Sequence, residues 1–190
     1  MRRRALVAGT AVLALVALAV GSFALAREDR PATAARVSVT KDELLAWETT
    51  VLPHLQAGGK TVENGMKAAI DDLVNRHVVP PHVIAKEADA WVDSLTLTRG
   101  KVAAVPTPEA LRPALDDFLA ALDEYVAAAG EFKKAALAPA GPQRDALVAS
   151  GIRRGEAADR VYDRGGHLVQ RLRISLGLPT SPNFPEVPDE

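Results

Sequence analysis

Apolar side chains recur at helical spacing through most of the chain after residue 40. The clearest run lies within residues 107–138, where the apolar positions are alternately four and three residues apart. They are Leu111, Leu115, Phe118, Leu122, Tyr125, Ala129, Phe132 and Ala136. This spacing places all of them on one face of an α-helix. We therefore predict a helix over 107–138, with Thr107 as its N-cap and Pro108 in its first turn.

Two other segments show the same alternation. The run within 81–104 consists of Ile84, Ala88, Trp91, Leu95, Thr98 and Val102. The run within 142–176 consists of Leu147, Gly151, Arg154, Ala158, Val161, Gly165, Leu168 and Leu172. Prolines precede both runs, and Gly177 with Pro179 is a typical helix stop. Helices are therefore predicted over 81–104 and 142–176.

A fourth helix is predicted over 41–77. Thr40 and Glu43 form a capping-box pattern at its start. Apolar or small residues then recur every seven positions, and a companion row lies three residues further on. The two rows are Leu45, Leu52, Gly59, Met66 and Leu73, and Leu55, Val62 and Ala69. One register runs through Pro53, where a kink is expected. A break into two helices at Gly58-Gly59 is the alternative.

Four amphipathic segments joined by short turns predict an all-α fold, an antiparallel (up-down) four-helix bundle over residues 40–178. The tail, 179–190, has a proline at every third position, which favours an extended polyproline II conformation. We expect it to be either a ligand for a proline-binding partner or a stiff solvated segment with Phe184 packed on the bundle.

The first 26 residues have the pattern of an export signal. Three arginines precede an uncharged apolar stretch, 5–26, which is long enough to span a membrane as a helix. Ala24 to Ala26 fits a signal-peptidase site. We predict either a signal peptide cleaved after Ala26 or a transmembrane anchor with its N-terminus inside. Residues 27–39 are a spacer. Either form places 27–190 outside the cytoplasm.

Composition narrows the possible chemistry. The chain of 190 residues has no Cys, which excludes disulfides, thiolate catalysis and Cys-ligated metal centres. Its net charge of −1 does not favour nucleic acid as a partner. No nucleophile motif, phosphate-binding loop or di-iron motif is present, so we predict neither a cofactor nor an enzymatic activity.

The helix glycines suggest a candidate ligand site. Glycine costs roughly 1 kcal/mol relative to Ala within a helix, and seven glycines fall in the first and last predicted helices. Either the two helices pack closely there, or the small side chains leave room for a ligand. The candidate ligand-binding residues are Gly59, Met66, Arg154 and Ala158. Arg154 falls on an apolar seam, and Glu48 is a possible ion-pair partner.

A candidate metal site consists of Asp159, Asp163 and His167. They are spaced four residues apart and therefore share one helix face. Their side chains are ligands for divalent ions. The alternative is a solvated face on which they pair with intervening arginines, Arg160, Arg164 and Arg171.

The layout resembles the uncharacterised exported helical-bundle proteins of high-GC actinobacteria. The features that carry the resemblance are the Arg-rich start, the apolar stretch after it, and the segments at 62–73 and 162–179. It implies an exported helical bundle and no particular functional residues. We therefore expect a non-enzymatic extracytoplasmic module that mediates protein or envelope interactions. The alternative is a bundle that binds a small ligand or metal.

Overall fold

Helices account for most of the residues that the computed structural model describes, 38–67 and 80–187. The four α-helices are α1 (Lys41–Thr61), α3 (Pro81–Ala103), α4 (Arg112–Leu137) and α5 (Pro142–Ser175). A π-helical turn, η1 (Val62–Lys67), continues α1, and a 3-10 turn, η3 (Glu109–Leu111), precedes α4. These ranges contain no strand, so the all-α class is confirmed.

Several predicted segments lie outside the described residues. They are the leader, the spacer up to residue 37, residues 68–77 of the first predicted helix and the last three residues of the tail. Within 38–67 and 80–187, no helix is both long enough and apolar enough to cross a membrane.

The capping box at the start of α1 is confirmed. Thr40 Oγ1 accepts a hydrogen bond from the Glu43 amide at 3.2 Å, and the Thr40 amide donates to Glu43 Oε2 at 2.8 Å. The helix then runs through Pro53 and Gly58 as far as Thr61, so the alternative, a break into two helices at Gly58-Gly59, is wrong.

The buried face of α1 differs from the predicted one by about one residue. Leu45 is 39% exposed, whereas Leu44, Trp47 and Val51 are buried. The predicted row includes Gly59, which has no side chain to bury. This row therefore specifies the buried face of α1 only weakly. The companion row agrees better with the structure, because two of its predicted core residues, Leu55 and Val62, are buried.

The seams of α3 and α4 are confirmed. All six predicted positions of α3 are buried, and in α4 only Tyr125 of the eight is partly exposed. The start of α4 differs from the prediction. Pro113 lacks an amide hydrogen, so it cannot donate the α-helical hydrogen bond to the carbonyl of residue 109. The chain therefore forms η3 first, and α4 begins at Arg112. Thr107 caps no helix but accepts a hydrogen bond from Trp47 Nε1 at 3.0 Å.

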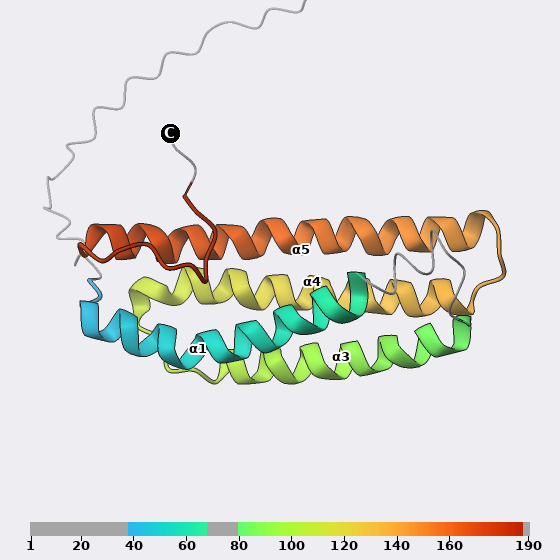
Figure 1. Cartoon of the computed structure of the whole chain (residues 1–190), viewed down its shortest axis with the longest axis horizontal. Helices are drawn as coiled ribbons and strands as arrows, with labels where there is room; N and C mark the ends of the chain where they lie inside the picture. Colours follow the sequence, from blue (N-terminus) through green and yellow to red (C-terminus); the bar gives the residue numbers. More distant parts are fainter. Residues whose placement is uncertain (1–37, 68–79, 188–190) are drawn as a thin grey trace, which may run out of the picture. The chain divides into compact units, whose positions relative to one another are not determined.

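Side-chain pairs show how the helices lie beside one another (Figure 1). Lys133 and Asp89 join α4 to α3 at 2.6 Å, and Arg99 and Asp123 join them again at 2.5 Å. α5 packs closely on the other side of α4, and α1 packs against α3. In the pairs that α4 forms with α3 and α5, residues early in one helix contact residues late in the other, as Asp89 does with Lys133 and Asp117 with Arg164.

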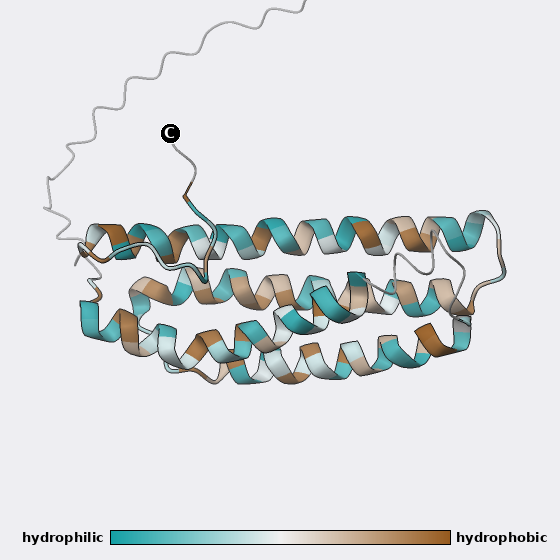
Figure 2. Ribbon diagram, viewed as in Figure 1, coloured by the Kyte–Doolittle hydropathy of each residue, from teal (hydrophilic) through white to brown (hydrophobic). Residues whose placement is uncertain are grey.

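α5 is the most polar of the four helices, and Figure 2 shows hydrophilic residues on most of its turns. It buries mainly small or polar residues, including Gly151, Ala158, Gly165 and Gln170. Gly177 ends it as predicted, with φ +67°. The amides of Gly177 and Leu178 donate to the carbonyls of Ile174 and Arg173, both at 2.9 Å, in a Schellman motif. This turn sends the tail back along α5.

Candidate functional site: a groove between α1 and α5

α5 and α1 leave a space between them. α5 packs along α4, whereas α1 packs on α3 and touches α5 at few points. Side chains of α4 line the bottom of this space. We call it the α1–α5 groove, and its two ends have different contents.

The tail fills the groove near the C-terminus of α5. The Gln170 side chain is fully buried and binds the tail backbone with both of its polar atoms. Its Nε2 donates to the carbonyls of Ser181 at 2.8 Å and Phe184 at 3.2 Å, and its Oε1 accepts from the Ser181 amide at 2.9 Å. On the α1 side, Gln56 Nε2 donates to Asn183 Oδ1 at 3.2 Å. The tail is therefore attached to both walls.

Phe184 anchors the tail in the apolar core. Its ring is stacked on that of Phe118, with centroids 6.0 Å apart and an interplanar angle of 19°. The predicted packing of Phe184 on the helices is thus confirmed. The described part of the tail, 179–187, does not have a regular polyproline II conformation, because the chain turns at Ser181 to Phe184. The Phe184 amide donates a hydrogen bond to the Ser181 carbonyl at 3.4 Å. The Gln170 contacts favour this turn over an extended chain.

A buried ion pair closes this end of the groove. Arg173 Nη1 donates to Glu48 Oε2, and Arg173 Nε donates to the Pro179 carbonyl at 2.7 Å. The two side chains are only 10% and 7% exposed. Glu48 Oε1 is buried without a hydrogen-bond partner among the described residues.

The predicted pairing of Arg154 with Glu48 is wrong. Arg154 Nη1 donates instead to Glu124 Oε2 of α4 at 2.9 Å. Glu48 lies beside the last turns of α5, and Arg154 is about 28 Å away from Arg173 along the helix axis.

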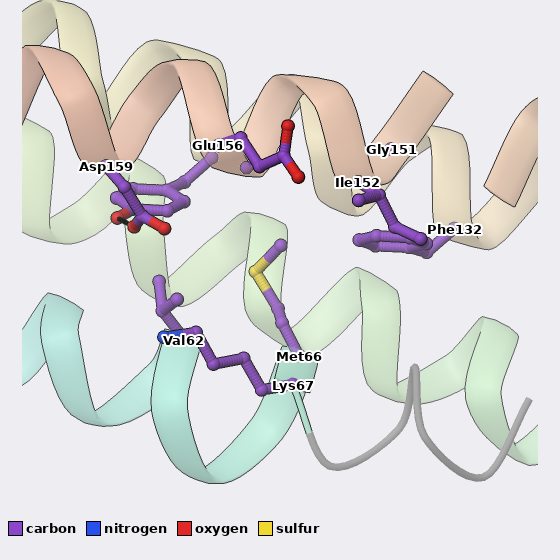
Figure 3. A pocket seen from close by; sticks show the side chains of 10 residues that line it. Val62, Met66, Lys67, Phe132, Gly151, Ile152, Glu156 and Asp159 are labelled. Carbon is purple, nitrogen blue, oxygen red and sulfur yellow. Dashed lines mark hydrogen bonds between the residues drawn. The ribbon is translucent and has the colours of Figure 1, made fainter. Parts of the chain in front are cut away.

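The other end of the groove holds an open pocket of about 270 Å³. It lies between η1, α4 and α5 (Figure 3). The lining residues are mostly apolar or small, with charged residues at the rim. They are Val62, Met66, Lys67, Tyr125, Phe132, Gly151, Ile152, Gly155, Glu156 and Asp159.

A second pocket of about 210 Å³ continues toward the tail. It shares Val62, Tyr125 and Asp159 with the first pocket and extends to Gly59 and Tyr162. The Tyr162 ring lies 5.1 Å from that of Phe118, which in turn stacks on Phe184. The two pockets and the tail therefore follow one another along a single groove.

Tyr125 and Asp159 form the main polar contact between the two pockets. The Tyr125 hydroxyl donates to Asp159 Oδ1. Burial, and then this hydrogen bond, raise the pKa of Tyr125 well above its usual value. Tyr125 is therefore a neutral donor throughout the physiological range. Lys67 at the rim pairs with Glu63 at 2.5 Å, and this contact raises the pKa of Lys67.

Two of the predicted ligand-binding residues line these pockets. Met66 lines the first and Gly59 the second. Ala158 is fully buried and, like Arg154, lines neither. The sequence analysis missed Tyr125, Phe132 and Glu156. Tyr125 and Phe132 belong to the α4 seam, and periodicity cannot distinguish a core position from one that lines a pocket.

The structure does not assemble the candidate metal residues. Within 38–67 and 80–187, no three His, Asp or Glu side chains are grouped closely enough to hold a metal ion. Asp159 binds Tyr125, whereas Asp163 is exposed. Arg164 pairs with Asp117 of α4, with Nε 2.8 Å from Oδ2, and not with an acid on its own helix.

Four of the helix glycines, Gly58, Gly65, Gly151 and Gly165, pack against α3 or α4. A Cβ atom on Gly151 would lie 2.6 Å from Phe132 of α4, and one on Gly65 would lie 2.6 Å from Trp91 of α3. The predicted close approach of the first and last helices through glycines is therefore wrong. Aromatic side chains of α3 and α4 occupy the space that Gly65 and Gly151 leave.

Comparison of the chain with models of protein families, with curated proteins and with solved structures finds no match.

Proposed function

We propose that this chain is a non-enzymatic extracytoplasmic module in which an antiparallel, up-down four-helix bundle holds a small ligand in the open end of the α1–α5 groove. The bundle arrangement is supported by the pairs that join early residues of one helix to late residues of its neighbour, such as Arg164 with Asp117 and Arg154 with Glu124. The open pocket beside Met66 is the observation that carries the ligand-binding proposal.

The proposed location rests on the leader. Residues 2–4 are basic and 5–26 are uncharged, as expected for an N-terminus that stays inside while the following chain is exported. The protein is membrane-anchored if the leader is retained and secreted if it is cleaved. N-terminal sequencing of the native protein distinguishes the two, because a start at Arg27 excludes the anchor.

The pocket fits a small, largely apolar ligand. Ligand pockets usually measure roughly 300–1,000 Å³ and combine apolar walls with a few polar groups. The pocket of about 270 Å³ is near the lower limit and has this composition. A short aliphatic chain or a single ring is therefore a more suitable occupant than a large cofactor.

Protein or envelope interactions are less well supported. The most exposed large apolar side chains, Leu97, Leu137 and Ile174, are 61%, 64% and 55% exposed. They lie on three different helices, and single exposed apolar residues are ordinary on protein surfaces. The tail is docked on its own bundle through Phe184, so its described part is not free for a partner.

Mass spectrometry of the native protein tests ligand binding. We expect the full chain, isolated under non-denaturing conditions, to carry a small apolar molecule that is released on unfolding. Gly155 lines the pocket, and a Cβ atom there meets nothing within 4 Å, so Gly155→Leu should fill the pocket without displacing the backbone.

Gly100→Leu on α3 is the matched control, because Gly100 is also helical and has no atom within 4 Å of a Cβ. Loss of the molecule in Gly155→Leu alone supports the proposal. Equal content in both variants, or none in the wild type, contradicts it.

A further inference from the structure

The lining of the open end has an excess of negative charge. Glu156 and Asp159 line the first pocket, and Glu63 lines the second. Lys67 is the one cation among the lining residues, and its ammonium group is paired with Glu63. No Lys or Arg of the described ranges forms an ion pair with Glu156 or Asp159, although the charge of Asp159, after that of Glu63, also helps to raise the pKa of Lys67. The lining therefore has three carboxylates and one ammonium group, and a bound cation would reduce this excess of negative charge.

Charge and apolar surface are separated along the pocket. Figure 3 shows Asp159 at one end and Phe132 with Ile152 at the other, with the side chains of Glu156 and Met66 between them. Tyr125 donates to Oδ1 of Asp159, and no other donor to this carboxylate occurs among the described residues. The second oxygen, Oδ2, is thus available to a ligand at the acidic end.

The filled end of the groove has the opposite polar chemistry. There, Gln170 and Arg173 donate hydrogen bonds to backbone carbonyls of the tail. Such donors suit a peptide, which presents carbonyl oxygens. The open end presents carboxylates instead, and these suit a ligand that carries donors and positive charge.

We propose, building on the ligand-binding function above, that the ligand is a small amphiphilic amine. Its ammonium group lies by Asp159 and Glu156, and its aliphatic chain runs past Met66 toward Phe132. The ammonium donates to Asp159 Oδ2, and the chain lies along the apolar part of the pocket, where Ile152 is 37% exposed.

Met66 allows a direct test in the full chain. The protein has only two methionines, Met1 and Met66, so ¹³C-methyl labelling gives at most two signals. Met66→Leu assigns the second. Labelled protein is titrated separately with octylammonium, octanol and octanoate below their aggregation concentrations. Because the Met66 methyl reports on the pocket, ligand that binds to the apolar leader or to detergent does not move this signal.

We expect octylammonium to shift the Met66 signal at a half-saturating concentration about tenfold below that of octanoate, since the carboxylates accept charge-assisted hydrogen bonds from an ammonium group and repel a carboxylate. Asp159→Asn combined with Glu156→Gln should remove most of this preference and leave octanol binding unchanged. Glu156→Gln alone, at an exposed position, provides a variant that should fold normally if the double variant does not.

The outcomes separate the two proposals. Equal binding of the three ligands, tighter binding of octanoate, or an ammonium preference that survives the substitutions overturns the amine inference and leaves ligand binding intact. If no ligand shifts Met66 in the wild type, both proposals fail.

Discussion

The two ends of the α1–α5 groove have the same walls and different contents. Near the end of α5, the returning chain places Phe184 and Pro185 between the helices. Toward the start of α5, the corresponding space beside Met66 is open. Gly166 and Gly155 show the contrast at single positions. They lie about three turns apart on one face of α5. A Cβ atom on Gly166 would lie 2.6 Å from Pro185, whereas one on Gly155 would meet nothing within 4 Å.

The described chain therefore fills the space between α1 and α5 at one end only. At one end, the occupant is part of the chain and is bound by buried polar groups, Gln170 and Arg173. At the other, the polar groups are carboxylates at the rim, and no segment of the described chain fills the space. The tail is therefore part of the core, and the open end is the place where we propose that a ligand binds.

The largest effect is expected from breaking the ion pair at the filled end. Arg173→Met leaves Glu48 as a buried, unpaired carboxylate and frees the Pro179 carbonyl. Removing one partner of a buried pair typically costs about 3–5 kcal/mol. We expect a loss of this size in the free energy of unfolding, measured by urea denaturation. Adding Glu48→Gln should recover part of it, and a loss below 1 kcal/mol for Arg173→Met would contradict the account.

Removing the tail anchor should have the next largest effect. Phe184→Ala deletes a ring that is 5% exposed and stacked on Phe118. The expected loss is about 3 kcal/mol, at the lower limit for a buried Phe, because the tail can detach by itself. Hydrogen exchange should become faster at Ser181 and Phe184. The Met66 methyl signal at the open end should stay in place, and a large shift there would show that the two ends are not independent.

The sequence predicted much of the fold because two helices have strong apolar periodicity. In α3 and α4, large apolar side chains such as Trp91, Leu95, Phe118 and Leu122 occupy many core positions, and burial of such side chains determines which face turns inward. The buried face of α1 was missed because its predicted row included Gly59, which has no side chain to bury. The turn at Gly177 was predictable, because a left-handed residue after a helix favours glycine.

The candidate site was less predictable because it depends on contacts between distant residues. Asp159 is bound by Tyr125, and Arg173 by Glu48, across different helices. Neither pair is a motif with fixed spacing. The groove itself depends on how far α1 lies from α5, and no local pattern encodes that distance. Met66 and Gly59 line the two pockets, and their role in ligand binding stays a prediction.

Tyr125 and Tyr162 lie between the two ends of the groove, and their ionisation at alkaline pH should have a smaller effect on stability. Burial raises the pKa of both tyrosines of the chain, Tyr125 and Tyr162, above the usual value of about 10. The contribution of the two neutral tyrosines to the free energy of unfolding is fully present below pH 10. It is lost as the pH rises further, because only the tyrosines of the unfolded chain then ionise readily. Absorbance near 295 nm should show no tyrosinate at pH 10 until the protein unfolds. Half-ionisation at pH 10 in the folded protein would contradict the burial.

The most direct test of the open and filled ends compares Gly155→Ala with Gly166→Ala. Both add one methyl group to the same face of the same helix, and both gain roughly 1 kcal/mol of helix propensity. At Gly155 the methyl group enters open space, so the free energy of unfolding should rise by about that amount. At Gly166 it collides with Pro185, and overpacking costs about 1–3 kcal/mol, so this variant should lose stability or release the tail. Equal stabilisation of both variants would contradict the account.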